Sequence, residues 1–173
     1  MAEQRAHDRF RLGFLTAVRI GEGAYVGGLL VTNRLGRPLE FQCTTPVRPN
    51  RTQEILYGPT LVPFILAELI GRTLVERIGV KPELLLVDRP ELLELRAHVA
   101  IPVGCLPPED APRDDAGLPS LGRQKVRLHG DHPGDLAALK IAAEAVPVDA
   151  DLLEPFERVR EALNETLTAG AVR

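Results

Sequence analysis

The chain has 173 residues, of which 45% are hydrophobic, and its formal net charge is −3. This length and composition predict one globular domain, with or without a short appended piece, and enough apolar side chains to form a core. The acidic balance, with two Tyr and no Trp, argues against nucleic-acid binding, which usually needs clustered Lys and Arg and aromatic rings for stacking.

Positive and negative charges are unevenly distributed along the sequence. Residues 1–51 hold eight Arg and four acidic residues, whereas residues 107–173 hold eight Lys plus Arg and thirteen acidic residues. The first ten residues are polar, and no uninterrupted apolar run approaches the roughly 20 residues that cross a membrane. We therefore expect a cytoplasmic location, with neither membrane nor nucleic acid as a partner.

Three strands are predicted before residue 45, because apolar and polar residues alternate over 10–20 and 39–44 and residues 25–32 are apolar throughout. Short Gly-containing turns separate them, which predicts an antiparallel meander. Gly27 and Gly28 interrupt the second strand, and this pattern indicates a bulge or a close packing contact. The period of two turns Cys43 toward the core as a small apolar residue, with a reactive thiol as the alternative.

The turn after the third strand offers the best candidate for a ligand site. Asn50 is a good N-cap and Gln53 can complete a capping box, so a short helix should begin near Arg51 and end at Gly58. Free backbone N–H groups would then lie beside Arg48 and Arg51, where a phosphate or carboxylate could bind. The predicted ligand-binding residues are Arg48, Asn50, Arg51 and Thr52. The alternative is that both arginines are solvated and pair with surface acids such as Glu54.

A second, longer helix is predicted from Thr60 to Ile78, and its polar face is unusually narrow. Glu68, Arg72 and Glu76 form one charged ridge at a spacing of four residues, and nearly all other positions are apolar. Such a helix must be covered on more than one side, by the sheet and by either the C-terminal helices or another subunit. We therefore expect a protein partner or self-association through this helix.

The remaining elements complete a sheet of five or six strands. Residues 83–87 and 97–103 are predicted strands joined by a turn or short helix at 90–95, and Cys105 ends this region as an ordinary buried residue. Residues 107–121 are rich in Pro and Asp and predict a linker or mobile loop. It would separate a core domain, residues 1–106, from residues 122–173, in which one strand and two helices (about 131–146 and 151–167) pack on the core.

Two C-terminal features resemble binding sites but have simpler interpretations. The basic row along 123–129 is typical of an edge strand protected by charge. His129, Asp131, His132 and Asp135 are close in sequence, yet their tight spacing around Pro133 favours a turn over a set of metal ligands.

The sequence thus predicts an α/β (α+β) fold, with a mainly antiparallel sheet packed against a long apolar helix and two C-terminal helices. It contains no catalytic constellation, cofactor motif or metal-ligand set, and whether the chain is an enzyme stays open. The function we expect is a non-enzymatic protein-interaction or assembly module that forms a homo-oligomer through the apolar helix. The alternative is a protein or enzyme that binds a small phosphate- or nucleotide-type anion at the 48–52 turn, and a thiol enzyme using Cys43 is a third possibility.

Overall fold

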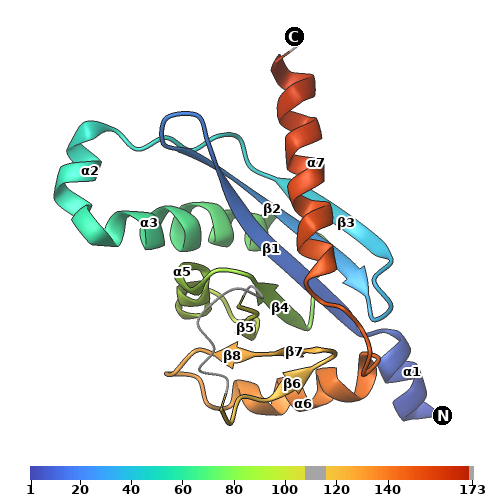
Figure 1. Ribbon diagram of the computed structural model, residues 1–173. Helices are drawn as coiled ribbons and strands as arrows, with labels where there is room; N and C mark the ends of the chain where they lie inside the picture. The colour runs from blue at the N-terminus through green and yellow to red at the C-terminus, as the bar shows by residue number, and fades with distance from the viewer. Residues whose placement is uncertain (108–115, 172–173) are drawn as a thin grey trace.

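The computed structural model describes residues 1–107 and 116–171, and its centre is a six-stranded mixed sheet with helices on both faces (Figure 1). The strand order is β3-β2-β1-β4-β5-β8. The strand bounds are β1 Arg11–Ile20, β2 Ala24–Asn33, β3 Pro38–Cys43, β4 Leu84–Val87, β5 Val103–Cys105 and β8 Arg127–Leu128. The α/β class predicted from the sequence is confirmed.

The first three strands form the predicted antiparallel meander, but the rest of the sheet differs from the prediction. β4 is parallel to β1, and β5 is parallel to β4. Parallel neighbours need a crossover connection. The helices between β3 and β4, and those between β4 and β5, provide it. The sheet is therefore mixed: the pairings of β1 with β2, β2 with β3 and β5 with β8 are antiparallel, and the two parallel pairings of β4 were not predicted.

The helical segment between β3 and β4 is one stretch with changing geometry. It consists of α2 (Arg51–Tyr57), the 3₁₀ turn η1 (Gly58–Thr60), α3 (Leu61–Pro63), the π-helical η2 (Phe64–Gly71) and α4 (Arg72–Arg77). Gly58 has a positive φ of 51°, and α2 turns there away from the line of the later segments (Figure 1). The predicted helix from Thr60 to Ile78 is thus present, although its middle is wound more loosely.

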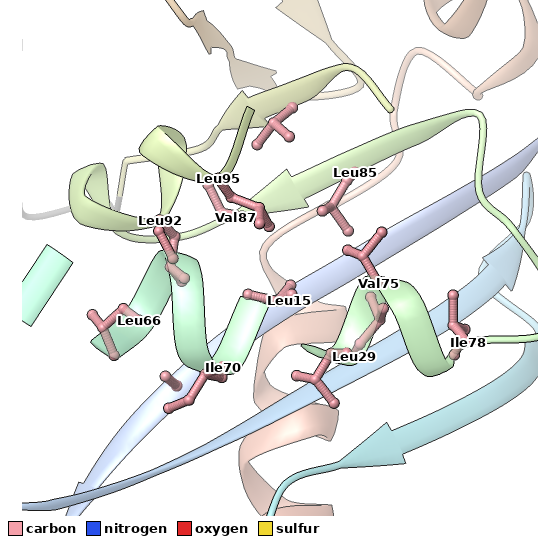
Figure 2. Packing of buried hydrophobic residues seen from close by; sticks show 14 of the residues in the cluster. Leu15, Leu29, Leu66, Ile70, Val75, Ile78, Leu85, Val87, Leu92 and Leu95 are labelled. Carbon is pink, nitrogen blue, oxygen red and sulfur yellow. The ribbon is translucent and has the colours of Figure 1, made fainter. Parts of the chain in front are cut away.

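Within this single chain, most apolar side chains of η2 and α4 are already buried, whereas Leu69 of η2 remains exposed. Leu66, Ile70, Val75 and Ile78 are buried in one cluster with residues of the sheet, and Leu92 belongs to the same cluster (Figure 2). The covering helices are α5 (Pro90–Leu93) and η3 (Glu94–Ala97), not the C-terminal helices. The core-facing side of this helix is therefore shielded without a second subunit, which weakens the physical basis for self-association through it.

The stretch Arg51–Arg77 is long and apolar enough to cross a membrane by length and composition. From the sequence we expected two separate helices here, one ending at Gly58 and one beginning at Thr60, and no uninterrupted apolar run of this length. The structure joins the two through η1. The stretch bends at Gly58, where φ is positive. Its apolar residues Ile65, Leu66, Ala67, Ile70, Leu74 and Val75 are buried in the core cluster that includes residues of the sheet.

The opposite face of the sheet carries the C-terminal helices α6 (Asp135–Ala145) and α7 (Glu154–Ala171). Phe156 packs on Phe14 of β1, with ring centroids 5.5 Å apart, and Val159 and Leu163 pack over β2. The smaller elements near them are α1 (Ala2–Asp8), β6 (Ser120–Leu121) and β7 (Gln124–Lys125).

Two further predictions on this side need comment. The basic segment 123–129 is split between β7 and the edge strand β8. Of the predicted strand 97–103, only Val103 lies in a strand, β5, because η3 extends to Ala97 and residues 98–102 are irregular. The division of the chain at 107–121 stays a prediction, and residues 108–115 lie outside the described residues. Leu121 and Val126 share one apolar cluster with Leu84 and Leu86 of β4.

Candidate functional site

The most promising position in this fold is the end of β4, beside β1. Leu15 of β1 is paired with Val87 of β4, so the next residues, Thr16 and Asp88, also lie side by side. The chain continues from β1 to β2 on one side and from β4 to β5 on the other. Ligands in open α/β sheets bind outside the carboxyl ends of the strands at such a switch point.

Asp88 is a buried carboxyl whose two oxygens have different surroundings. Its side chain is 7% exposed. The hydroxyl of Thr16 donates a hydrogen bond of 2.9 Å to Oδ2, and the guanidinium of Arg160 on α7 donates to the same oxygen. Oδ1 is buried and has no hydrogen-bond partner among the described residues. A buried oxygen without a partner is uncommon in native proteins and indicates a strained or functional position.

Burial is the main influence on the charge of this group. It raises the pKa of Asp88 above the ordinary value of an aspartate, while the Thr16 hydrogen bond and the Arg160 charge act in the opposite direction. Nearby, burial and then the charge of Asp88 raise the pKa of Cys105 to about 12. Cys105 therefore stays a protonated thiol at neutral pH and is an inert core residue.

Asp88 lies at a pocket of about 260 Å³ between the end of β4 and the first turns of α7. The lining residues are Asp88, Asp151, Leu153, Glu154, Phe156, Glu157 and Arg160. Four carboxyl groups and one guanidinium give this lining an acidic character.

The other three carboxylates of the pocket differ in the hydrogen bonds and ion pairs that they form with the protein. Glu154 pairs with Arg158 at 3.1 Å, and Asp151 accepts a backbone hydrogen bond of 3.1 Å from Leu153. Glu157 is exposed and makes no hydrogen bond or ion pair with any residue that the structure describes. It is therefore the carboxylate of this pocket that is most available to a ligand.

The donor atoms of this pocket fit a divalent cation that is shared with a substrate. Mg²⁺ is commonly held by one or two carboxylates together with phosphate oxygens, and the unpartnered oxygen of Asp88 and the carboxylate of Glu157 are of this kind. Across residues 1–107 and 116–171, no three His, Cys, Asp or Glu side chains are grouped to hold a metal by themselves. Substrate oxygens would have to complete the coordination.

The ligand-binding residues predicted from sequence lie elsewhere, at the start of α2. Asn50 caps the helix through Gln53 in the predicted capping box, with hydrogen bonds of 2.8 and 3.0 Å. Arg48, Arg51 and Thr52 are exposed, and Arg51 pairs with Glu54 at 3.2 Å, as in the alternative interpretation. A ligand role for these four residues stays a prediction.

In the His129–Asp135 segment, the ring centroids of His129 and His132 lie 5.3 Å apart, whereas the side chain of Asp135 is directed to another partner. Asp135 forms two hydrogen bonds with Arg96, and His129 lies 3.4 Å from Glu94. His132 donates a backbone hydrogen bond to the carbonyl of His129, which closes the predicted turn.

Sequence reasoning missed Asp88 and both residues that donate hydrogen bonds to its Oδ2, Thr16 and Arg160. One signal was present, because Asp88 is a carboxylate that directly follows the apolar run 84–87. A polar residue just past a buried strand is placed where ligands bind. Thr16 and Arg160 gave no such signal, since one sits inside a strand and the other on an ordinary amphipathic helix.

Comparisons with known proteins give structural likeness only. No family model matches the sequence, and no curated protein matches it. Human ENDOV is similar in structure, with 16% identity, a TM-score of 0.47 and coverage of 96% of each chain. The catalytic domain of human Endonuclease V has 14% identity and a TM-score of 0.43, with 97% of this chain and 89% of that chain covered.

Endonuclease V of Ciona intestinalis, in complex with a 23mer DNA containing an inosine, has 10% identity and a TM-score of 0.42. The match covers 67% of this chain and 58% of that chain, so the present chain spans little more than half the length of that structure.

These findings bear on three predictions. The similar structures are nucleases, and one of those described holds DNA. The expected non-enzymatic interaction or assembly module and the exclusion of nucleic acid as a partner are contradicted by these matches, and the small-anion protein given as the alternative is not supported by them. The physical reasons are that most of the apolar helix is covered within the chain, and that a net charge says little about the charges at one pocket.

Proposed function

We propose that this chain acts on nucleic acid as a phosphodiesterase that depends on a divalent cation, with its reaction centre in the Asp88 pocket. The observation that carries the proposal is the buried, unpartnered Oδ1 of Asp88 beside an acidic pocket at the carboxyl end of β4. The proposal rests on this pocket. Nucleic acid enters it as the substrate class to test, because the similar structures are named as endonucleases and one contains DNA. The cytoplasmic location expected from the sequence remains part of the proposal.

The charges of the pocket explain why a cation belongs to the proposal. Four carboxyl groups would repel a phosphodiester. A divalent cation, when bound, would offset the charge of the phosphate and act as a Lewis acid on it.

The side chains of the chain itself have separate roles. Asp88 and Glu157 would accept the cation, and Arg160, whose side chain is 42% exposed, has free N–H donors for a phosphate oxygen. Thr16 would fix the orientation of the Asp88 carboxyl through its 2.9 Å hydrogen bond.

The test uses fluorescently labelled oligonucleotides. Single-stranded DNA, duplex DNA, duplex DNA containing inosine, and RNA are incubated with the full chain and either Mg²⁺, Mn²⁺ or EDTA. Binding is followed by anisotropy and cleavage by gel electrophoresis. We expect binding and cleavage only with a cation, and we expect Asp88→Asn to lower the cleavage rate by about 10–100-fold or more, as for loss of a residue that supports a metal site.

Asp149→Asn is the matched control, because Asp149 is an exposed aspartate just before α7 that does not line the pocket. It should cleave like the original chain. The proposal is overturned if no oligonucleotide binds or is cleaved with either cation, or if Asp88→Asn behaves like the control.

A further inference from the structure

The contact between Arg160 and Asp88 places a positive charge where the proposed site needs its cation. Arg160 donates to Oδ2 of Asp88, and among the described residues it has no other hydrogen bond or ion pair. Its side chain is 42% exposed, whereas that of Asp88 is 7% exposed. The guanidinium therefore covers the carboxyl from the solvent side while remaining in contact with water.

We infer that Arg160 is a latch: its guanidinium, bound to Oδ2, serves as the internal counter-ion of Asp88, and its positive charge must move away before a divalent cation can bind at the unpartnered Oδ1 of the same carboxyl. This inference concerns regulation of the site and rests on the proposed function. In the latched state the Asp88 charge is balanced inside the protein and the site is closed. In the open state the cation takes over that charge, and Arg160 is free to contact the phosphate.

The latch can open without movement of α7. Phe156, Val159 and Leu163 lie buried on the side of the helix that faces the sheet, and they hold it in place. Arg160 lines the pocket from the flank of the same helix, so rotation about its side-chain bonds is sufficient.

Opening has an energetic requirement that sets the expected effect. Breaking a buried pair leaves an uncompensated carboxylate, which is strongly unfavourable unless another cation replaces the guanidinium. When only a minor fraction of molecules is open, the apparent affinity for the cation falls by that fraction. Removing the guanidinium should therefore raise the affinity of the site for a divalent cation.

The test measures Mn²⁺ binding to the full chain without nucleic acid, from the loss of the free Mn²⁺ signal in electron paramagnetic resonance. The variants are Arg160→Ala, Arg160→Gln and the double variant Asp88→Asn/Arg160→Ala. We expect both single variants to bind Mn²⁺ about tenfold more tightly than the original chain. The double variant should lose this gain, and circular dichroism is used to check that each variant is folded.

Arg72→Ala is the matched control, because it removes an exposed arginine that pairs with Glu76 on α4, on the opposite face of the sheet from α7. It should leave Mn²⁺ binding unchanged. The latch is wrong if folded Arg160 variants bind Mn²⁺ no more tightly than the original chain, or if the gain persists in the double variant. Absence of any action on nucleic acid would instead overturn the proposed function, so the two failures are distinguishable.

Discussion

Gly27 of β2 lies so close to Ile70 of η2 that no side chain fits between them. A Cβ atom placed on Gly27 would be 2.1 Å from Cγ2 of Ile70. This contact resolves the two interpretations of the glycine pair in favour of close packing, since β1 and β2 pair without a break in register through Gly27 and Gly28. It brings the π-helical segment down onto the sheet.

The close approach predicts that Gly27→Ala is destabilising. Overpacking of a filled core usually lowers the free energy of unfolding by about 1–3 kcal/mol, which urea unfolding would measure. Gly134→Ala is the control, because its φ of −63° suits any residue and nothing lies within 4 Å of its Cβ position. In the double variant Gly27→Ala/Ile70→Ala, the second substitution should reduce the penalty of the first. Independent, additive effects would contradict the contact.

The ion pair between Arg96 and Asp135 predicts a large effect when one partner is removed. Its side chains are 16% and 8% exposed, and two hydrogen bonds of 2.7 and 3.3 Å join them. Asp135→Ala leaves a buried guanidinium without its carboxylate and should lower the free energy of unfolding by about 3–5 kcal/mol.

The exposed pair between Arg72 and Glu76 is the comparison for this experiment, because its loss should change stability by only about 0–1 kcal/mol. Thermal unfolding of Asp135→Ala and Arg72→Ala measures both. Equal shifts in the two variants would show that burial does not govern the Arg96–Asp135 pair.

We expect the carboxylate of Glu40 to make a contribution to the free energy of unfolding that depends on pH. Its carboxylate accepts hydrogen bonds from the backbone N–H groups of Gly79 and Val80 and from Gln42. The bond from Gly79, followed by those from Gln42 and Val80, lowers the pKa of Glu40 below its ordinary value. A lowered pKa in the folded state means that the contribution is present above the ordinary glutamate pKa and is lost as pH falls through the folded pKa.

Glu40→Gln should accordingly be less stable than the original chain at neutral pH, and the difference should shrink on acidification. Urea unfolding at stepwise lower pH gives this difference directly. Glu165→Gln, at an exposed position of α7, should show no comparable trend. A Glu40→Gln difference that stays constant with pH would refute the prediction.

We expect the two cysteines to react at different rates with an alkylating agent. Cys105 is 2% exposed and its pKa is raised to about 12, so it should react only when the chain unfolds. Cys43, on the edge strand β3, is partly exposed and should be modified first in the native state. Labelling followed by mass spectrometry of Cys43→Ser and Cys105→Ser variants assigns each rate. Rapid native labelling of Cys43→Ser would contradict the buried thiol.

Local patterns predicted the parts of the fold that depend on neighbouring residues. The Asn50–Gln53 capping box, the meander of β1 to β3 and the turn at His129 each depend on residues a few positions apart, and all are present. The parallel pairing of β4 with β1 was missed, because alternation of apolar residues defines a strand but not its neighbour.

The candidate site could not be predicted from the sequence for a related reason. Thr16 and Arg160 are each separated from Asp88 by 72 positions, and only the folded sheet and α7 bring them together. No spacing rule spans such a distance. The turn at Arg48 to Thr52 was more visible in the sequence because its residues are adjacent, although its arginines remain exposed in the structure.

The separation of Asp88 from Arg160 along the chain also means that the two residues are synthesised at different times. A ribosome makes polypeptides from the N-terminus, so β1 and β4 emerge before α7 does. The contact between Arg160 and Asp88 can form only after α7 has been synthesised. A chain that ends before residue 160 would have the Asp88 carboxyl without this guanidinium.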